Sequence, residues 1–282
     1  MKLCVKPHGG RSFYSVQKPM KTGLVLSGGG ARGISHIGAI KALLEHNIKF
    51  DIISGTSAGA FIGALLGYGY SPDEILDIFI KTKFSYSLRF GFSTGGLLSI
   101  ENADKILLKY IPENTFESLK IPLVVTTTDI HAGEEVCFRN GELAKPVLAS
   151  CCLPGLFKPL HFQGRDLVDG AIFNNLPVAA IEKEVNYLIG IHCNPITLKK
   201  SSPHIHNITY RSFRLAMRGK AKASLDRCDL LIEAPELYNF SPFDFRKTRK
   251  LFDIGYSYTK ELLINFQRSD VGSKAKNIEP PK

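Results

Sequence analysis

The hydrophobic and polar positions of the chain follow two patterns, short apolar runs and longer segments with helical spacing. The apolar runs predict buried strands at residues 23–27, 50–54, 121–127, 187–192 and 230–233. Helical spacing predicts helices over residues 34–46, 58–67, 101–110 and 144–151. Strands that alternate with helices are typical of a mostly parallel sheet covered on both faces, so the pattern predicts an α/β fold.

Local signals add detail to this outline. Ser71 is an N-cap residue followed by Pro72 and, three residues after the cap, by Glu74, which predicts a helix start. Residues 135–138, followed by Arg-Asn-Gly at 139–141, predict a hairpin arm. The aromatic, glycine-broken segment 84–98 fits either a lid or acyl-binding wall, or ordinary core packing.

Nothing between residues 22 and 265 resembles a linker or a repeat. We therefore expect a single domain there, with residues 1–21 and 266–282 as tails. The composition, with 44% hydrophobic and 22% charged residues among 282, is that of an ordinary globular protein. No apolar stretch approaches the roughly 20 residues that a membrane-spanning helix needs, and the first residues carry no apolar signal core.

The six cysteines show no metal-binding or disulfide spacing and fit buried, reduced thiols, which favours a cytoplasmic location. The net charge of +10 is unevenly spread, because no acidic residue occurs before Glu45 or within residues 199–225. Such basic fields attract anionic lipid headgroups or nucleic acid, or are simply solvated faces. The segment 210–222 mixes arginines with apolar residues, as a helix on an anionic membrane would, so peripheral membrane contact is one reading. No nucleic-acid-binding module is present, and the oligomeric state is left open.

Three local motifs carry chemistry. The first is the run Gly-Gly-Gly-Ala-Arg-Gly at residues 28–33, between a predicted strand and a predicted helix. Glycines there let backbone N–H groups face a ligand at a helix N-terminus. A dinucleotide site uses the same geometry but needs an acidic residue at the carboxyl end of the second strand. Asp51 lies at the beginning of that strand, which argues against a dinucleotide.

The second motif, Gly55-Thr56-Ser57-Ala58-Gly59, occupies that carboxyl end. In a G-x-S-x-G turn between a strand and a helix, the flanking glycines relieve crowding and the serine hydroxyl projects from the sheet edge. Ser57 is therefore the predicted nucleophile. The amides of Gly28, Gly29 and Gly30, from the neighbouring strand, are predicted to form the oxyanion hole. Arg32 either places charge near the site or only supports the loop.

The third motif is the turn Asp169-Gly170-Ala171. A nucleophilic serine needs a base within hydrogen-bond reach. An ordinary α/β-hydrolase would supply an Asp and then a His, with its serine turn after several strands, whereas Ser57 follows only two. The later histidines sit in no recognisable catalytic turn, so Asp169 is the predicted base rather than a mere turn residue.

The three motifs in this order resemble the patatin-like phospholipases, and the resemblance covers about residues 22–182. It implies a three-layer α/β/α fold, a Ser57–Asp169 dyad without histidine, and hydrolysis of acyl esters, often phospholipids, with no metal or cofactor. Lipid or acyl-ester substrates are the expected partners. Further motif positions are Arg32, Gly33, Gly55, Gly59, Gly170 and Ala171. The alternative is a non-catalytic lipid- or acyl-binding protein that retains the fold.

Overall fold

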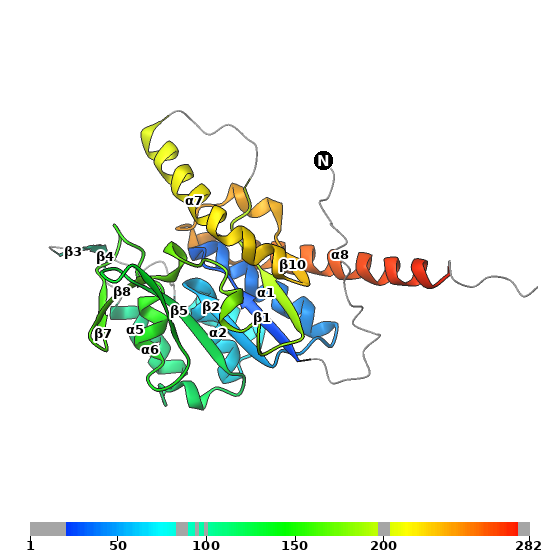
Figure 1. Ribbon diagram of the computed structural model, residues 1–282, viewed down its shortest axis with the longest axis horizontal. Helices are drawn as coiled ribbons and strands as arrows, with labels where there is room; N and C mark the ends of the chain where they lie inside the picture. Colours follow the sequence, from blue (N-terminus) through cyan, green and yellow to red (C-terminus); the bar gives the residue numbers. More distant parts are fainter. Residues whose placement is uncertain (1–20, 83–89, 94–95, 99–100, 197–203, 276–282) are drawn as a thin grey trace, which may run out of the picture.

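The structure is a computed structural model that describes residues 21–82, 90–93, 96–98, 101–196 and 204–275 (Figure 1). The predicted lid segment 84–98 lies largely outside the described residues, as do most of the two predicted tails. Within the described part of the chain, no helix has both the length and the apolar character needed to cross a membrane.

Eight strands form one sheet in the order β10-β9-β1-β2-β5-β8-β7, with β6 also paired to β5. Five neighbouring strands run parallel: β10 (Leu230–Ile232), β9 (Tyr187–Ile191), β1 (Thr22–Leu26), β2 (Ile52–Thr56) and β5 (Leu123–Asp129). The antiparallel edge is made by β6 (Glu134–Phe138), β8 (Arg165–Asp169) and β7 (Leu160–Phe162). A separate hairpin joins β3 (Phe90–Ser93) and β4 (Gly96–Leu98). The predicted mostly parallel sheet is confirmed.

The helices are α1 (Ile34–Glu45), α2 (Ala58–Tyr68), α3 (Pro72–Lys81), α5 (Glu101–Tyr110), α6 (Ala144–Ala149), α7 (Ile205–Arg227) and α8 (Thr248–Ala275). The predicted start of α3 is confirmed, since Ser71 and Glu74 cap each other's backbone N–H groups. The predicted hairpin arm at residues 135–138 is confirmed as β6, which pairs antiparallel with β5, but the hairpin turns at residues 130–133, before the strand and not at 139–141, and Gly133 there has φ +67°.

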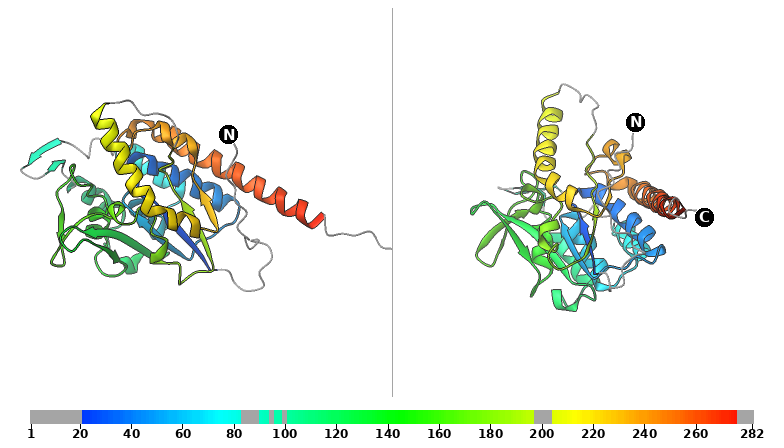
Figure 2. Two further views of the ribbon diagram at one scale, coloured as in Figure 1. Left: turned by 45° about the horizontal axis from the view of Figure 1, so that its top comes forward. Right: turned by 45° about the vertical axis from the view of Figure 1, so that its right-hand side comes forward.

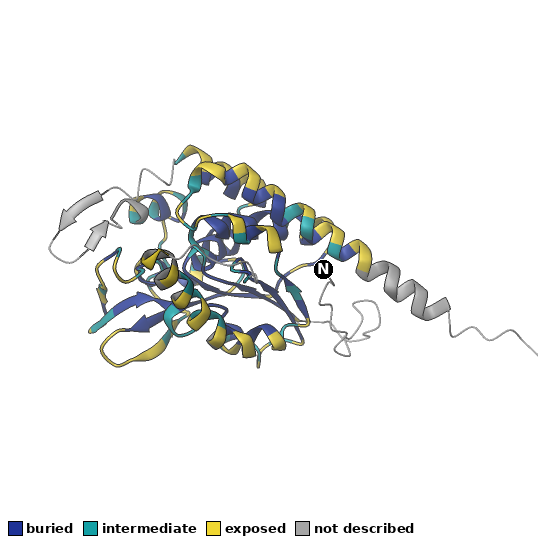
Figure 3. Cartoon of the chain, turned by 90° about the horizontal axis from the view of Figure 1, so that it is seen from above, coloured by how far each residue is buried: buried dark blue, intermediate teal, exposed yellow. Residues whose placement is uncertain are grey.

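The alternation of side chains along the strands builds two apolar layers. In β1, Leu24 and Leu26 enter the large core under α1, α2, α3 and α8, while Val25 faces a smaller cluster on the opposite face. That second cluster is covered by the segment around Leu176 and by the C-terminal end of α7, where Leu225 packs. The buried strands between exposed helix faces are visible in Figure 3. Helices thus flank a buried sheet on both sides, as the α/β/α prediction requires.

Helix α8 lies against α1, and the two run along one side of the molecule (Figure 2). Their contact needs two glycines, because a Cβ on Gly38 would strike the Phe252 carbonyl and one on Gly255 would strike the Ser35 carbonyl. The backbones therefore approach more closely than side chains would allow. Helix α7 projects from the body beside the carboxyl ends of the parallel strands (Figure 1).

Candidate active site

Ser57 occupies a sharp turn between β2 and α2. Its backbone angles, φ 53° and ψ −122°, are rare for a residue with a Cβ. The turn is held from below: the Ser57 N–H donates to Ser150 Oγ at 2.7 Å, and that hydroxyl donates to the Thr126 carbonyl at 2.6 Å. The surrounding structure therefore fixes a conformation that an isolated peptide would avoid.

Glycine at position 59 is needed for this turn. A Cβ there would collide with the Leu26 carbonyl at the end of β1, so only glycine lets α2 start so close to the sheet. Comparable close approaches exist at the other motif glycines, Gly28, Gly29, Gly30, Gly33, Gly55 and Gly170. The glycines of all three motifs thus let the turns pack against one another.

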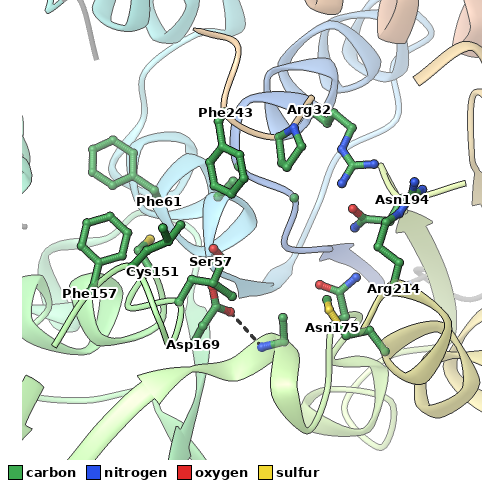
Figure 4. A pocket seen from close by; sticks show the side chains of 18 of the residues that line it. Arg32, Ser57, Phe61, Cys151, Phe157, Asp169, Asn175, Asn194, Arg214 and Phe243 are labelled. Atoms are coloured by element: carbon green, nitrogen blue, oxygen red, sulfur yellow. Dashed lines mark hydrogen bonds between the residues drawn. The ribbon is translucent and has the colours of Figure 1, made fainter. Parts of the chain in front are cut away.

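Asp169 ends β8 and is 4% exposed. One carboxylate oxygen, Oδ1, accepts the Ala171 N–H at 2.9 Å, which leaves the other oxygen for Ser57. The loop after Asp169 is tied to β2, because the hydroxyls of Ser54 and Thr56 donate to carbonyls at positions 177 and 174, each at 2.9 Å. The structure thus brings Asp169 and Ser57 together at one sheet edge (Figure 4).

Burial raises the pKa of Asp169 to about 7, although hydrogen bonds with the Ala171 N–H and the Ser57 side chain act against the rise. A carboxylate with such a pKa is a far better proton acceptor at neutral pH than an ordinary aspartate. The thiol of Cys151 also lies beside this pair. Burial and the nearby Asp169 charge raise its pKa well above the usual value, so it remains a neutral thiol.

The glycine loop is shaped by distant parts of the chain. The Gly28 N–H donates to the Asn175 carbonyl at 3.2 Å, and the Ala31 N–H donates to the Pro242 carbonyl at 2.7 Å. Gly28 is therefore a weaker candidate for the oxyanion hole than the sequence predicts, since its amide already has a backbone acceptor. Gly29 and Gly30 line the pocket, and Gly30 has φ +56°, a conformation that suits glycine.

The pocket above Ser57 has two unlike ends and an empty volume of about 1270 Å³, including its open mouth. One end is apolar and is lined by Phe61, Phe79, Leu148, Leu153, Leu156 and Phe157. The other end carries the polar lining residues Arg32, Asn175, His192, Asn194, Arg214 and Arg218. Ser57 and Asp169 lie between the two ends (Figure 4). Arg32 is buried and lines this end of the pocket.

A buried polar chain supports the second end. His192, 1% exposed, lies with Nδ1 2.6 Å from Glu233 and with Nε2 3.4 Å from the Asn175 amide nitrogen. Burial lowers the pKa of His192. Burial alone would raise the pKa of Glu233, but His192 and Arg218 outweigh it and lower the pKa to about 2. Because both ring nitrogens of His192 are engaged, this histidine has none to offer as the base for Ser57.

Sequence reasoning missed this polar chain. Asn175 follows the Asp169 turn, His192 follows β9, and Glu233 follows β10. His192 and Glu233 therefore lie at the carboxyl ends of two strands that the sequence predicts. Ligand sites of open parallel sheets lie at such ends, so listing every polar residue after each predicted strand would have flagged His192 and Glu233. Of the cysteines described, Cys152 and Cys193 are buried as expected, but Cys137 is exposed.

A parallel sheet with a strained serine turn and a buried carboxylate is the architecture of a nucleophile-elbow α/β protein. The family model of the patatin-like phospholipases matches residues 24–181. The chain belongs to the patatin-like phospholipase family.

The chain is similar to curated lysophospholipases in sequence and to a solved structure in fold. The chain is 26% identical over 292 residues to the lysophospholipase NTE1 of Meyerozyma guilliermondii, covering 88% of this chain and 19% of the relative. It is 28% identical over 275 residues to the lysophospholipase NTE1 of Coccidioides immitis, covering 86% and 17%. The chain thus spans about a fifth of these relatives' length. The crystal structure of VipD from Legionella pneumophila shares the fold, with a TM-score of 0.51, 18% identity, and coverage of 88% of this chain and 67% of VipD.

Proposed function

We propose that this protein is a serine acyl hydrolase that cleaves carboxylic ester bonds of lipids through the dyad Ser57–Asp169. The observation that carries the proposal is the pairing of a strained, buried serine with a buried carboxylate whose pKa is about 7, at the foot of an apolar pocket. Strained backbone of this kind clusters at functional sites, and its place at a serine beside a buried carboxylate favours an enzyme.

In the acylation step, Ser57 Oγ attacks the ester carbonyl carbon while its proton passes to Asp169. The carbonyl oxygen becomes an oxyanion, which the N–H groups of Gly29 and Gly30 stabilise. The bond from carbon to the alcohol oxygen then breaks, and the leaving alcohol takes the proton from Asp169. The product is an acyl ester of Ser57 and a free alcohol.

In the deacylation step, water attacks the acyl ester and gives its proton to Asp169. The second tetrahedral intermediate collapses with release of Ser57 Oγ, which recovers the proton. A free fatty acid leaves, and the dyad is restored. Every proton in this cycle passes through Asp169, so neither a histidine nor a metal is needed.

The two ends of the pocket suit an amphipathic ester. The acyl chain fits the aromatic and leucine-lined end, and a polar, anionic alcohol half fits the end with the arginines. Relatives named lysophospholipases favour a phospholipid with one acyl chain. We therefore place lysophospholipids first among the substrates, with phospholipase A activity on two-chain lipids second.

The test is mass spectrometry of the purified protein after exposure to a fluorophosphonate, alongside Ser57→Ala. We expect one adduct, on Ser57, in the unchanged protein and none in the variant. Folded protein that gives no adduct, even with lipid vesicles present, would instead favour a non-catalytic lipid- or acyl-binding protein.

Peripheral contact with an anionic membrane is part of the proposal. Helix α7 bears the exposed side chains of Ile208 and Leu215 among its arginines, close to the pocket mouth that Met217 lines. We expect the protein to sediment with vesicles that contain phosphatidylserine and less with neutral ones. The double variant Ile208→Glu, Leu215→Glu should lose this binding, whereas Leu44→Glu, an exposed leucine on α1, should keep it. Equal binding by both variants would exclude α7 as the contact.

A further inference from the structure

The side chain of Asn175 presents an unused acceptor to the pocket. Asn175 is 2% exposed and lines the pocket beside the candidate dyad. Within the part of the chain that the structure describes, its Oδ1 atom has no hydrogen-bond partner. Because a buried acceptor without a partner is costly, the site is built to receive a hydrogen from something that enters it.

The orientation of this amide is fixed by its neighbours. The Glu233 carboxylate, which Arg218 also contacts, can only accept, so His192 donates to it from Nδ1. The neutral ring then has a bare Nε2, which accepts from the Asn175 Nδ2 group. With its nitrogen used in this way, the amide turns Oδ1 away from His192.

The freed oxygen lies beside the nucleophile. The point where a Cβ on Gly28 would stand is 2.8 Å from Asn175 Oδ1 and 3.1 Å from the Ser57 Cβ, so both atoms border the same glycine. In Figure 4 the oxygen of the Asn175 amide faces the side of Ser57 and Asp169, and the nitrogen faces away. An acceptor at this place cannot stabilise an oxyanion and must instead meet a donor of the substrate.

We propose that Asn175 Oδ1 accepts a hydrogen bond from the free hydroxyl of a monoacyl glycerolipid, and so selects one-chain over two-chain substrates. The inference rests on the proposed function. With the acyl chain in the apolar end, the glycerol carbon next to the ester lies toward the polar end. In a monoacyl lipid that carbon bears a hydroxyl, whereas in a diacyl lipid its oxygen is esterified and has no proton to donate. His192 and Glu233 act as positioning residues that hold the amide.

The test compares hydrolysis of 1-palmitoyl lysophosphatidylcholine with that of its 2-deoxy and 2-O-methyl analogues. The unchanged protein should favour the hydroxyl substrate in kcat/KM by about 10- to 100-fold, the usual effect of leaving a buried acceptor unmet. Asn175→Leu should bring this ratio close to one. The matched control is Asn174→Leu, because the Asn174 side chain bonds Glu135 outside the pocket, and it should keep the ratio.

A second variant probes the positioning residues. In Glu233→Leu, His192 Nδ1 loses the acceptor that holds the ring proton on that nitrogen. The proton is then free to occupy Nε2, and in that state the Asn175 amide turns over and presents its NH₂ group to the substrate. The hydroxyl preference should therefore fall, a change that mere loosening of the fold would not produce. Thermal unfolding of each variant reports whether it folds.

The outcomes separate the two proposals. A wild-type ratio close to one, or a ratio that Asn175→Leu leaves unchanged, would overturn the role of Asn175 while ester hydrolysis itself still stands. An equal loss on all three substrates would likewise overturn it and assign Asn175 to the attacking water or to the scaffold. Absence of both hydrolysis and fluorophosphonate labelling in the unchanged protein would remove the proposed function and this inference together.

Discussion

Two carboxylates that lie at strand ends, one buried and one largely buried, have pKa values shifted in opposite directions. Asp169 ends β8, no cation among the described residues contributes to its pKa, and burial raises that pKa to about 7. Glu233 follows β10, is held by His192 and Arg218, and its pKa is lowered to about 2. Asp169 is buried and Glu233 is largely buried, with a side chain 20% exposed, and burial acts to raise both pKa values, so burial alone does not decide the outcome. A buried carboxylate left with neutral partners becomes a base, and one paired with a cation becomes a structural anchor.

The largest expected effect is the loss of turnover in Asp169→Asn, which removes the carboxylate with the raised pKa. We expect turnover to fall by about 10²- to 10⁴-fold, because the amide cannot take the Ser57 proton. The fold should survive, since the Ala171 N–H can still donate to the remaining amide oxygen. Initial rates and a circular dichroism spectrum check both points. Near-normal turnover in the variant would show that another group is the base.

The pH dependence of the unchanged protein follows from the same carboxylate. Asp169 must be deprotonated to act, so kcat/KM should rise with pH and level off above a midpoint close to 7. Below the midpoint the rate should fall by about tenfold per pH unit. Glu233, ionised far below this range, should contribute no step. A midpoint near the ordinary aspartate value would contradict the buried-base assignment.

Removal of the Glu233 carboxylate should lower the stability of the protein. Glu233→Leu takes away the acceptor of His192 Nδ1 and the partner of Arg218. We expect the free energy of unfolding to fall by about 1–3 kcal/mol, the cost of leaving such groups unpaired. Urea denaturation measures it. Arg227→Met, which removes a more exposed pair with Glu182, is the control and should cost less than about 1 kcal/mol.

The smallest expected effect is on how the stability of the protein depends on pH, because the two carboxylates act on it in opposite directions. The folded-state pKa of Asp169 is raised, so its contribution to stability is present below the unfolded pKa and is lost as pH rises through about 7. The pKa of Glu233 is lowered, so its contribution is present above the unfolded value and is lost as pH falls through about 2. Urea denaturation should be measured at about pH 5 and pH 8. Relative to the unchanged protein, Asp169→Asn should have a higher free energy of unfolding at the higher pH than at the lower one. Glu233→Gln should show no such gain.

The chemistry-bearing turns could be predicted from sequence because each is local. Ser57 and Asp169 stand in short motifs whose residues are adjacent in the sequence, although the motif glycines Gly59 and Gly170 pack against carbonyls of other strands. The alternating and helical patterns likewise gave most strands and helices. The β7–β8 hairpin is not predicted from the sequence. Its two short strands join through Gln163 and Gly164, both at positive φ, and glutamine is not a typical turn residue.

The polar end of the pocket could not be predicted because it depends on strand order. Asn175, His192 and Glu233 meet only since β9 and β10 lie on the far side of β1 from β2. No local pattern specifies the pairing of β9 with β1, which lie more than a hundred residues apart in the sequence, or the contacts of His192 with Asn175 and Glu233, which span 17 and 41 residues. The sequence predicts the basic residues of α7 as a charged field, but the place of Arg218 against Glu233, 15 residues further on, depends on how the chain passes from α7 into β10.

The glycine loop also has a consequence for the order of synthesis. Its backbone is held by the carbonyls of Asn175 and Pro242, and β1 itself pairs with β9. A nascent chain therefore carries both Ser57 and Asp169 long before it can shape the loop that serves them. We expect a ribosome-bound chain that stops short of residue 242 to resist fluorophosphonate labelling, and one that has exposed α8 to react. By this reasoning, the candidate lipid hydrolase stays inert until the ribosome has passed residue 242 and α8.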